Sequence, residues 1–257
     1  MNIAIITGAS SGMGKEFVIQ ADKRYNLDEI WVIARREDRL VALQSETKAK
    51  IVPLALDLTK PESFETVANK LNSEKPDVKL LVNASGFGKM GEFISSNPDS
   101  NAGMIELNFK ALVLMTQTVL PYIKEGGKII EVGSLSSFEP VPHLSVYAAT
   151  KAGVLSFTRA LAHELKPKKI KVLCLCPYWV KTEFFNRAGE KESLKKFDIL
   201  YDADYVVKVA YKTIDKRKKN YVVPGKYAKL LRALAKFLPH NFMMAVMSKM
   251  FKFEKND

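Results

Sequence analysis

Short apolar runs alternate with amphipathic stretches along most of the chain. The first run covers residues 2–6, is rich in β-branched side chains and ends at a glycine-rich turn, which is the pattern of a buried strand. Six later runs have the same character, and the stretches between them have helical spacing. We therefore expect strands at residues 2–6, 30–34, 51–55, 78–82, 128–132, 170–175 and 221–223. We expect helices at residues 12–25, 37–47, 61–73, 98–120, 145–165 and 203–215.

Buried strands separated by helices predict right-handed crossovers and a parallel sheet with helices on both faces. The expected fold class is therefore α/β: a single-domain, Rossmann-type, doubly wound parallel sheet of about seven strands. No internal repeat or low-complexity linker divides the chain. We expect one domain at 1–225, with an irregular stretch at 181–202, and a basic amphipathic helical C-terminal extension at 226–257.

Composition agrees with one large globular core. The chain has 257 residues, of which 47% are hydrophobic and 26% charged, and the 13 glycines and 11 prolines are too few for a disordered or collagen-like chain. No apolar run reaches the roughly 18 residues of a membrane-spanning helix, and the N-terminus lacks the basic region of a secretory signal. We expect a cytoplasmic protein.

The formal net charge of +12 is concentrated at the C-terminal end. Residues 216–257 hold eleven basic and two acidic side chains, whereas residues 1–215 have a net charge of only +3. A positive surface is typical of proteins that bind nucleic acid or anionic membranes. Here any such role belongs to the C-terminal extension.

The extension has an amphipathic pattern. Apolar residues recur at helical spacing in 227–238, with basic residues mostly on the opposite side, and a second apolar stretch follows Pro239. One hypothesis is a helix packed on the body or at a subunit contact of a homo-oligomer. The other is a cationic segment that lies on an anionic membrane or caps the entrance for an apolar substrate. The pattern indicates packing more than base stacking, so nucleic acid is not expected as a partner.

A glycine-rich turn follows the first expected strand and opens the first expected helix. It reads Thr7-Gly8-Ala9-Ser10-Ser11-Gly12-Met13-Gly14. In this position glycines let the backbone approach a pyrophosphate, which binds at the N-terminus of the helix. The alternative is a purely structural turn. The candidate cofactor-binding residues are Gly8, Ser10, Ser11, Gly12, Met13 and Gly14.

The end of the second expected strand distinguishes between dinucleotides. An NAD enzyme places an acidic residue about 20 positions after the turn, where it binds the ribose 2′-hydroxyl. Here Arg35 and Arg36 stand 21 and 22 residues after Gly14. Guanidinium groups suit a 2′-phosphate, so NADP(H) is the favoured cofactor. The alternative is a solvated helix start, because Glu37 and Asp38 follow.

A phenol and an ammonium group stand four residues apart at Tyr147 and Lys151, which puts them on one face of a helix. Ser134 lies thirteen residues upstream, just after an expected strand, and ligands bind at strand ends in open parallel sheets. A nearby cation favours the phenolate, so we expect the ammonium group to lower the pKa of Tyr147.

Together these motifs resemble the short-chain dehydrogenase/reductase family over about residues 1–225. The resemblance rests on the turn at 7–14 and on Asn108, Ser134, Tyr147 and Lys151. It implies that Tyr147 is the general acid/base, that Ser134 binds the substrate carbonyl, and that Lys151 lowers the pKa of the tyrosine and binds the nicotinamide ribose. Asn108 would hold a water in a proton relay. Further implied cofactor contacts are Asp57, Leu58, Asn83, Ala84, Ser85, Pro177, Val180 and Thr182.

Two segments depart from the family pattern. The usual Asn-Asn-Ala-Gly reads Asn83-Ala84-Ser85-Gly86, and the usual Pro-Gly reads Pro177-Tyr178, which puts an aromatic side chain near the nicotinamide.

The two cysteines, Cys174 and Cys176, are expected to be buried thiols rather than metal ligands. No metal site is predicted.

An apolar, aromatic wall is expected for the substrate pocket. It would come from residues 135–144, which include Phe138, Pro140, Pro142 and His143, from 87–88 and from 178–185. Such a wall suits a bulky hydrophobic ketone or secondary alcohol better than a sugar or a charged acid. The family resemblance implies that residues 1–225 form the dinucleotide-binding and catalytic domain of an NADP(H)-dependent oxidoreductase that interconverts a secondary alcohol and a ketone. By the same resemblance the foremost substrate on this wall is a hydroxysteroid or bile acid. The alternatives are a 3-oxoacyl or general carbonyl reductase and, in another class, a non-catalytic NADP(H)-sensing regulator.

Overall fold

The computed structural model describes residues 1–184, 199–216 and 219–250, with side chains up to Ser248. Within these residues seven parallel strands form one sheet in the order β3-β2-β1-β4-β5-β6-β7. The strand order reverses direction between β1 and β4, which is where open parallel sheets bind ligands. The strands are β1 (Asn2–Thr7), β2 (Glu29–Ala34), β3 (Lys50–Ala55), β4 (Asp77–Asn83), β5 (Lys128–Val132), β6 (Lys171–Leu175) and β7 (Tyr221–Val222).

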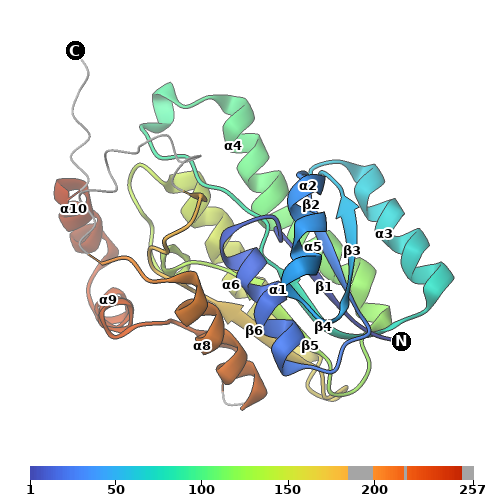
Figure 1. Ribbon diagram of the computed structural model, residues 1–257. Helices are drawn as coiled ribbons and strands as arrows, with labels where there is room; N and C mark the ends of the chain where they lie inside the picture. The colour runs from blue at the N-terminus through green and yellow to red at the C-terminus, as the bar shows by residue number, and fades with distance from the viewer. Residues whose placement is uncertain (185–198, 217–218, 251–257) are drawn as a thin grey trace.

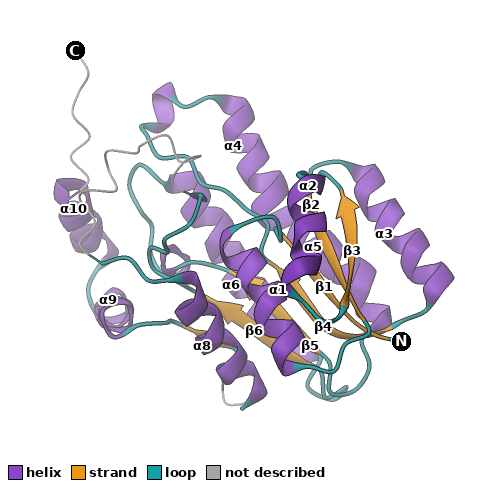
Figure 2. Cartoon of the chain, viewed as in Figure 1, coloured by secondary structure: helices purple, strands orange, loops and turns teal. Residues whose placement is uncertain are grey.

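Helices cover both faces of this sheet (Figures 1 and 2). On one face lie α1 and α8, and on the other α3, α5 and α6. The helices are α1 (Gly12–Arg24), α2 (Glu37–Val41), α3 (Pro61–Glu74), α4 (Pro98–Ile105), α5 (Ala111–Val119), α6 (Ser145–Glu164), α8 (Ala203–Asp215), α9 (Lys226–Phe237) and α10 (His240–Met250).

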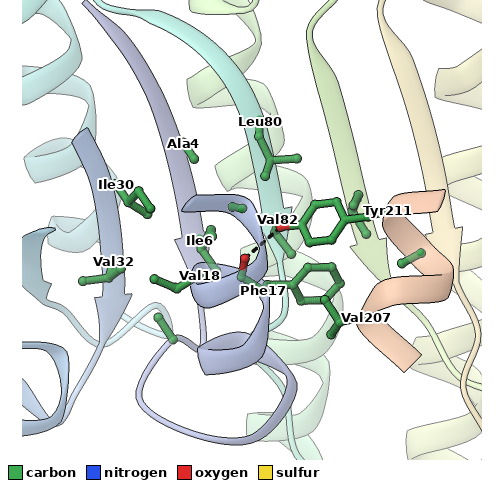
Figure 3. Packing of buried hydrophobic residues seen from close by; sticks show 14 of the residues in the cluster. Ala4, Ile6, Phe17, Val18, Ile30, Val32, Leu80, Val82, Val207 and Tyr211 are labelled. Atoms are coloured by element: carbon green, nitrogen blue, oxygen red, sulfur yellow. Dashed lines mark hydrogen bonds between the residues drawn. The ribbon is translucent and has the colours of Figure 1, made fainter. Parts of the chain in front are cut away.

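The alternation of side chains along β1 supplies both halves of the core. Ala4 and Ile6 point to the α1 and α8 face, whereas Ile3 and Ile5 point to the other. On the first face the Tyr211 hydroxyl donates a 2.8 Å hydrogen bond to the carbonyl oxygen of Phe17, and the two rings meet edge to face (Figure 3). Burying an aromatic side chain such as that of Phe17 contributes about 2 kcal/mol to the free energy of unfolding. This packing holds α1, and therefore the turn before it, against the sheet.

The predicted fold class is confirmed, and two predicted helices differ in detail. The helix expected at 37–47 consists of α2 and a 3₁₀ segment, Ala42–Glu46. The helix expected at 98–120 is interrupted by a π-helical segment, Glu106–Lys110, between α4 and α5. Sequence periodicity does not reveal one added residue in a helical turn, and such π-bulges occur frequently at functional sites. The expected irregular stretch at 181–202 lies mostly outside the described residues.

The C-terminal extension forms α9 and α10, separated by Leu238 and Pro239. Its domain boundary at residue 225 stays a prediction. Among the described helices, none has the length and apolar character needed to cross a bilayer. The end of the apolar stretch expected after Pro239, which includes Phe251 and Phe253, lies outside the described part of the chain.

The two cysteines are buried free thiols, as predicted. Their sulfur atoms lie 3.5 Å apart on β6 and just beyond it, behind Gly133. Across the described residues, no cluster of three or more His, Cys, Asp or Glu side chains has the arrangement of a metal site.

Candidate active site

The glycine-rich turn joins β1 to α1 at the point where the strand order reverses. Gly8 has a φ of +69°, which glycine adopts without strain, and a Cβ there would lie 2.9 Å from the backbone of Ala84 and Ser85. A Cβ at Gly14 would collide with the carbonyl oxygen of Gly8. These glycines keep the turn close-packed, so that the N-terminus of α1 opens into the cleft above it.

A cleft runs from this turn to the ends of β2, β3 and β4. It is the part of the structure that fits a dinucleotide, because the glycine-rich turn, the N-terminus of α1 and two arginines line it. Most of the predicted cofactor residues meet there. They are Gly8, Ser10, Ser11, Gly12, Met13, Gly14, Arg35, Arg36, Asp57, Leu58, Ala84, Ser85 and Thr182.

Arg36 is the best-anchored cation of this cleft. Its Nη2 donates hydrogen bonds of 3.0 Å to the hydroxyls of Ser10 and Ser11, and its Nη1 lies 2.9 Å from a carboxylate oxygen of Glu183. Arg39 binds the other oxygen of Glu183 at 2.5 Å. The hydrogen bonds from Arg39 and Arg36 hold the pKa of Glu183 at about 2. Arg36 and Arg39 therefore already bind a carboxylate, that of Glu183, in this cleft.

Glu183 was not identified from the sequence. It belongs to the irregular stretch after β6, and nothing in its local pattern indicates a contact with residues 144 and 147 positions earlier in the chain. Arg35, in contrast, is more than half exposed and lies 4.0 Å from Asp57. Burial alone would raise the pKa of Asp57, but hydrogen bonds from Thr59 together with the positive charge of Arg35 lower it.

Three of the four predicted catalytic side chains line a second pocket. Ser134 follows β5, whereas Tyr147 and Lys151 lie on the first turns of α6. The Ser134 side chain is hydrogen-bonded to Tyr147. The Nζ of Lys151 lies 5.7 Å from the centre of the Tyr147 ring and donates a 2.7 Å hydrogen bond to the carbonyl oxygen of Val132. The spacing in the sequence thus brings hydroxyl, phenol and ammonium to one site.

The pKa of Tyr147 differs from the sequence-based expectation. Burial raises it to about 12, and the hydrogen bond with Ser134 lowers it only in part. Burial also lowers the pKa of Lys151 to about 8, and the neighbouring Cys174, Cys176 and Glu131 offset part of this shift. The physical reason is that both groups lie in a desolvated site, where the neutral form of each is favoured. The phenol in this structure therefore keeps its proton at neutral pH.

Asn108 lies in the π-helical segment and is completely buried. Its Oδ1 accepts a 2.9 Å hydrogen bond from the backbone N–H of Phe87, and its Nδ2 donates to the Phe87 carbonyl at 2.8 Å and to Thr150 Oγ1 at 3.2 Å. The Thr150 hydroxyl in turn donates to the carbonyl of Tyr147 at 2.7 Å. Asn108 thus joins the loop after β4 to the helix that carries Tyr147. Its proposed contact with a water stays a prediction.

Asn83 is placed away from the dinucleotide cleft. Its amide lies in the core beneath α5, with its Nδ2 3.0 Å from Thr116 Oγ1 and 3.3 Å from Glu131 Oε1. Glu131 is completely buried, and its other carboxylate oxygen has no hydrogen-bond partner among the described residues. Burial raises the pKa of Glu131 to about 8 despite the hydrogen bonds from Thr116 and Asn83. The structure thus assigns Asn83 a position within the sheet, next to a protonated carboxyl group.

This buried carboxyl group makes stability depend on pH. Between its unfolded pKa near 4.5 and about 8, the folded state binds more protons than the unfolded state, so the free energy of unfolding falls as pH rises. The slope for this one group is at most about 1.4 kcal/mol per pH unit. In urea unfolding between roughly pH 5 and 7, we expect Glu131→Gln to lose this decline relative to the unmodified protein. Equal slopes for both proteins would contradict the assignment.

The second pocket is mainly apolar and is continuous with the dinucleotide cleft, because Met13, Ala84, Gly86, Thr182 and Phe184 line both. Of the predicted cofactor contacts, Pro177 and Val180 line this pocket, as do Tyr147 and Lys151. Among its other lining residues are Leu135, Glu139, Val141, Leu144, Tyr178, Trp179, Tyr227, Leu231, Met243, Val246 and Met247.

Several residues predicted for the pocket wall lie elsewhere. Phe138 packs against Tyr221 and under Arg232, Phe87 lines the dinucleotide cleft, and His143 lines a separate hollow beside Glu92 and Phe93. Phe185 lies outside the described residues. In their place, side chains of α9 and α10 complete the wall.

Among the described residues of this wall, only Glu139 carries a carboxyl group, and the sequence analysis did not identify it. It is buried, and burial raises its pKa to about 7 although Arg232 opposes the shift. The proline and apolar residues around it give no local signal that it faces inward.

Comparisons with known proteins agree with this geometry. The NADP-dependent 3-hydroxy acid dehydrogenase of Schizosaccharomyces pombe is 34% identical over 187 residues, which are 70% of this chain and 72% of that protein. The human 17-beta-hydroxysteroid dehydrogenase 13 is 28% identical over 255 residues, or 96% of this chain and 82% of that protein.

Solved structures with the same fold contain either dinucleotide. A short-chain dehydrogenase from Sphingobium yanoikuyae in complex with NADPH has a TM-score of 0.79 at 27% identity and covers 100% of this chain and 98% of its own. A short-chain dehydrogenase/reductase from Burkholderia phymatum in complex with NAD has a TM-score of 0.78 at 20% identity, covering 91% and 92%. The fold alone therefore does not select between the two cofactors.

The family whose profile matches the sequence is described as short chain dehydrogenase, and the match covers residues 2–193. It includes the glycine-rich turn, Ser134, Tyr147 and Lys151, and it spans the strands at whose ends both pockets open. This chain belongs to the short-chain dehydrogenase family.

Proposed function

We propose that the protein is an NADP(H)-dependent oxidoreductase that interconverts a secondary alcohol and a ketone on a bulky hydrophobic substrate. One observation carries the proposal. Ser134, Tyr147 and Lys151 meet on the wall of an apolar pocket that is continuous with a cleft suited to a dinucleotide. A reacting carbonyl in this pocket would lie between the hydroxyl groups of Ser134 and Tyr147 on one side and the dinucleotide cleft on the other.

The preference for NADP(H) is supported by Arg36. Its guanidinium donates to two serine hydroxyls and a carboxylate at one end of the cleft, and such a planar group also binds a phosphate by paired hydrogen bonds. The N-terminus of α1 and the backbone at Gly8 would hold the pyrophosphate. When bound, the nicotinamide supplies or accepts the hydride.

The residues of this chain supply the proton and hold the carbonyl. In ketone reduction the phenol of Tyr147 donates its proton to the carbonyl oxygen, and the pKa of about 12 keeps that proton in place beforehand. Ser134 donates a second hydrogen bond to the same oxygen, where negative charge develops. Lys151 places a positive charge beside the phenol ring, and it would hold the ribose of the bound cofactor. Asn108 positions the loop and α6 through Phe87 and Thr150.

The substrate class follows from the pocket. The wall is apolar and suits an apolar fused ring system better than a polar sugar. It is formed by Tyr178, Trp179, Phe184 and side chains of α9 and α10. The relative named 17-beta-hydroxysteroid dehydrogenase 13 supports a hydroxysteroid, bile acids included, as the foremost substrate. A 3-oxoacyl compound or a simple ketone is the alternative. A cytoplasmic location and homo-oligomerisation stay predictions.

A substrate panel tests this proposal. The consumption of NADPH is followed by its absorbance with oxo-steroids, oxo-bile acids, 3-oxoacyl thioesters and small ketones. The formation of NADPH from NADP⁺ is followed in the same way with the matching alcohols. We expect the highest kcat/KM with a steroid-sized ketone. Binding of NADPH without turnover of any compound would instead indicate the non-catalytic sensor.

The carboxylate of Glu183, which lines the cleft and binds two arginines, leads to a further prediction. Glu183 binds Arg36 and Arg39, so a 2′-phosphate there meets a negative charge at short range. We expect Glu183→Gln to lower the KM for NADPH about fivefold, as removal of a repulsion near 1 kcal/mol between part-exposed charges implies. The KM for NADH should not change. Glu125→Gln, which removes an exposed carboxylate paired with Lys169, is the matched control. An equal KM for NADPH in both variants would refute the idea.

A further inference from the structure

The outer side of α9 presents apolar side chains to solvent. Leu230, Leu234 and Phe237 are 56%, 38% and 77% exposed, and their spacing of four and three residues puts them on one face of the helix. The opposite side of the same helix is packed, because Ala228 and Ala235 are buried. This helix therefore has an apolar face that the body of the protein does not cover.

The next helix also has exposed apolar side chains. In α10 Phe242 is 55% and Val246 39% exposed, and only Leu238 and Pro239 separate the two helices. Figure 1 shows α9 and α10 together at one edge of the molecule, away from β1, β2 and β3. Single exposed apolar residues are ordinary, but a concentration of them on two consecutive helices marks an interaction site. We call Leu230, Leu234, Phe237, Phe242 and Val246 the apolar patch.

The charged side chains of the segment that carries the apolar patch are all basic. Residues 226–250 contain no Asp or Glu, and Lys226, Lys229 and Lys236 are exposed on α9. Apolar side chains with flanking lysines are the composition of helices that lie on anionic membranes. A second copy of this chain, brought face to face by a two-fold axis, would set these lysines against the same lysines. The charge pattern thus favours a lipid surface over a dimer.

The same two helices form part of the substrate pocket. Tyr227 and Leu231 of α9 and Met243 and Met247 of α10 line its wall. Val246 both lines the pocket and is part of the apolar patch. A surface that contacts the patch is therefore adjacent to this wall of the pocket.

We propose that α9 and α10 dock the protein on the surface of an anionic phospholipid bilayer. The apolar patch lies at the boundary between headgroups and acyl chains, and Lys226, Lys229 and Lys236 bind the lipid phosphates. In this orientation the pocket wall formed by these helices faces the lipid, so an apolar substrate dissolved in the membrane reaches Tyr147 through a short apolar path.

Co-sedimentation of the full chain with vesicles tests the proposal. One set of vesicles is phosphatidylcholine alone, and the other is equal parts phosphatidylcholine and phosphatidylglycerol. We expect binding to the anionic vesicles, weaker binding at higher salt, and at least a tenfold lower partition coefficient for the combined variant Leu230→Gln, Leu234→Gln, Phe237→Gln. The control Val41→Gln, which changes an exposed valine on α2, should bind like the unmodified protein.

A second pair of variants tests the charges. Lys226→Gln, Lys229→Gln and Lys236→Gln together should weaken binding at least tenfold, whereas Lys23→Gln, Lys48→Gln and Lys166→Gln remove the same charge from other exposed sites with a much smaller effect. Near-ultraviolet circular dichroism and turnover of a small soluble ketone should be unchanged in the patch variant, because none of its three residues lines either pocket.

Two results would overturn the proposal. One is equal vesicle binding by the patch variant and the Val41→Gln control. The other is an absence of binding to the anionic vesicles. A dimer that the patch variant converts to a monomer in analytical ultracentrifugation would then make the patch a contact between copies of the chain. Vesicle binding does not require turnover, so this proposal and the proposed catalytic function fail separately.

Discussion

Replacing Tyr147 by Phe is expected to lower kcat at least 100-fold while leaving the Kd for NADPH within about twofold, since a positioned acid contributes roughly 10²–10⁴ to a rate. The substitution removes one oxygen atom, the one hydrogen-bonded with Ser134. The ring keeps its contact with Phe184, whose centre lies 5.7 Å away, so the pocket should retain its shape. Steady-state kinetics and fluorescence titration with NADPH measure the two quantities.

The matched control is Tyr122→Phe, which also removes a phenolic hydroxyl that is hydrogen-bonded in the structure, in this case to Asn72. That tyrosine lies in neither pocket, and its variant should keep full activity. Turnover near the level of the unmodified enzyme in Tyr147→Phe would refute the role of this residue as the proton donor. Loss of NADPH binding in that variant would show that the substitution disturbs the cleft instead.

Replacing Arg36 by Ala is expected to raise the KM for NADPH about 10- to 100-fold, which corresponds to the loss of one charge-assisted interaction of about 1.5–3 kcal/mol. The KM for NADH should change less than about threefold, because NADH lacks the 2′-phosphate that the guanidinium would bind. The ratio of the two kcat/KM values, measured with one ketone, reports the change in cofactor preference.

Arg159→Ala is the control for this experiment, because that arginine is exposed on α6 and lines neither pocket. Equal losses of kcat/KM with NADPH and NADH in Arg36→Ala would indicate that the residue supports the turn through Ser10 and Ser11 and does not bind the 2′-phosphate. In that case the cofactor preference would rest on Arg35 or would not favour NADP(H).

The regular part of the fold was predictable from the sequence because each buried strand is a short β-branched run bounded by turn residues. The strands at 2–6, 30–34 and 128–132 are found within about one residue at each end. The interruption near Asn108 was not predictable, since it depends on the fit of that side chain to the backbone of Phe87, which is 21 residues earlier in the chain. Local periodicity does not contain such a contact.

The candidate site was predictable where its groups follow a strand or share a helix turn. Gly8 and Ser134 follow strands, and Tyr147 and Lys151 share a turn of α6, so local spacing is enough to bring each group to the site. Glu183, Glu139 and the side chains of α9 and α10 reach the pockets only through tertiary packing. The motif at Asn83 was present, but the carboxyl group of Glu131 places its side chain inside the sheet.

The pKa of Tyr147 shows a similar limit. The sequence gives the neighbouring ammonium group, which would lower this pKa, but it does not give the degree of burial. In the folded protein burial has the larger effect and raises the pKa to about 12. A phenol that holds its proton suits ketone reduction directly, whereas alcohol oxidation first requires the loss of that proton.

The transfer of hydrogen itself tests the central claim most directly. The unmodified enzyme is incubated with a steroid-sized ketone and, in separate reactions, with NADPH carrying deuterium in each of the two positions at nicotinamide C4. Mass spectrometry then measures deuterium in the alcohol product. We predict deuterium at the carbinol carbon from one of the two labelled cofactors and, under the same conditions, at least 100-fold slower product formation by Tyr147→Phe. Reduced product without deuterium from either cofactor, or equal product formation by the variant, would contradict hydride transfer at this site.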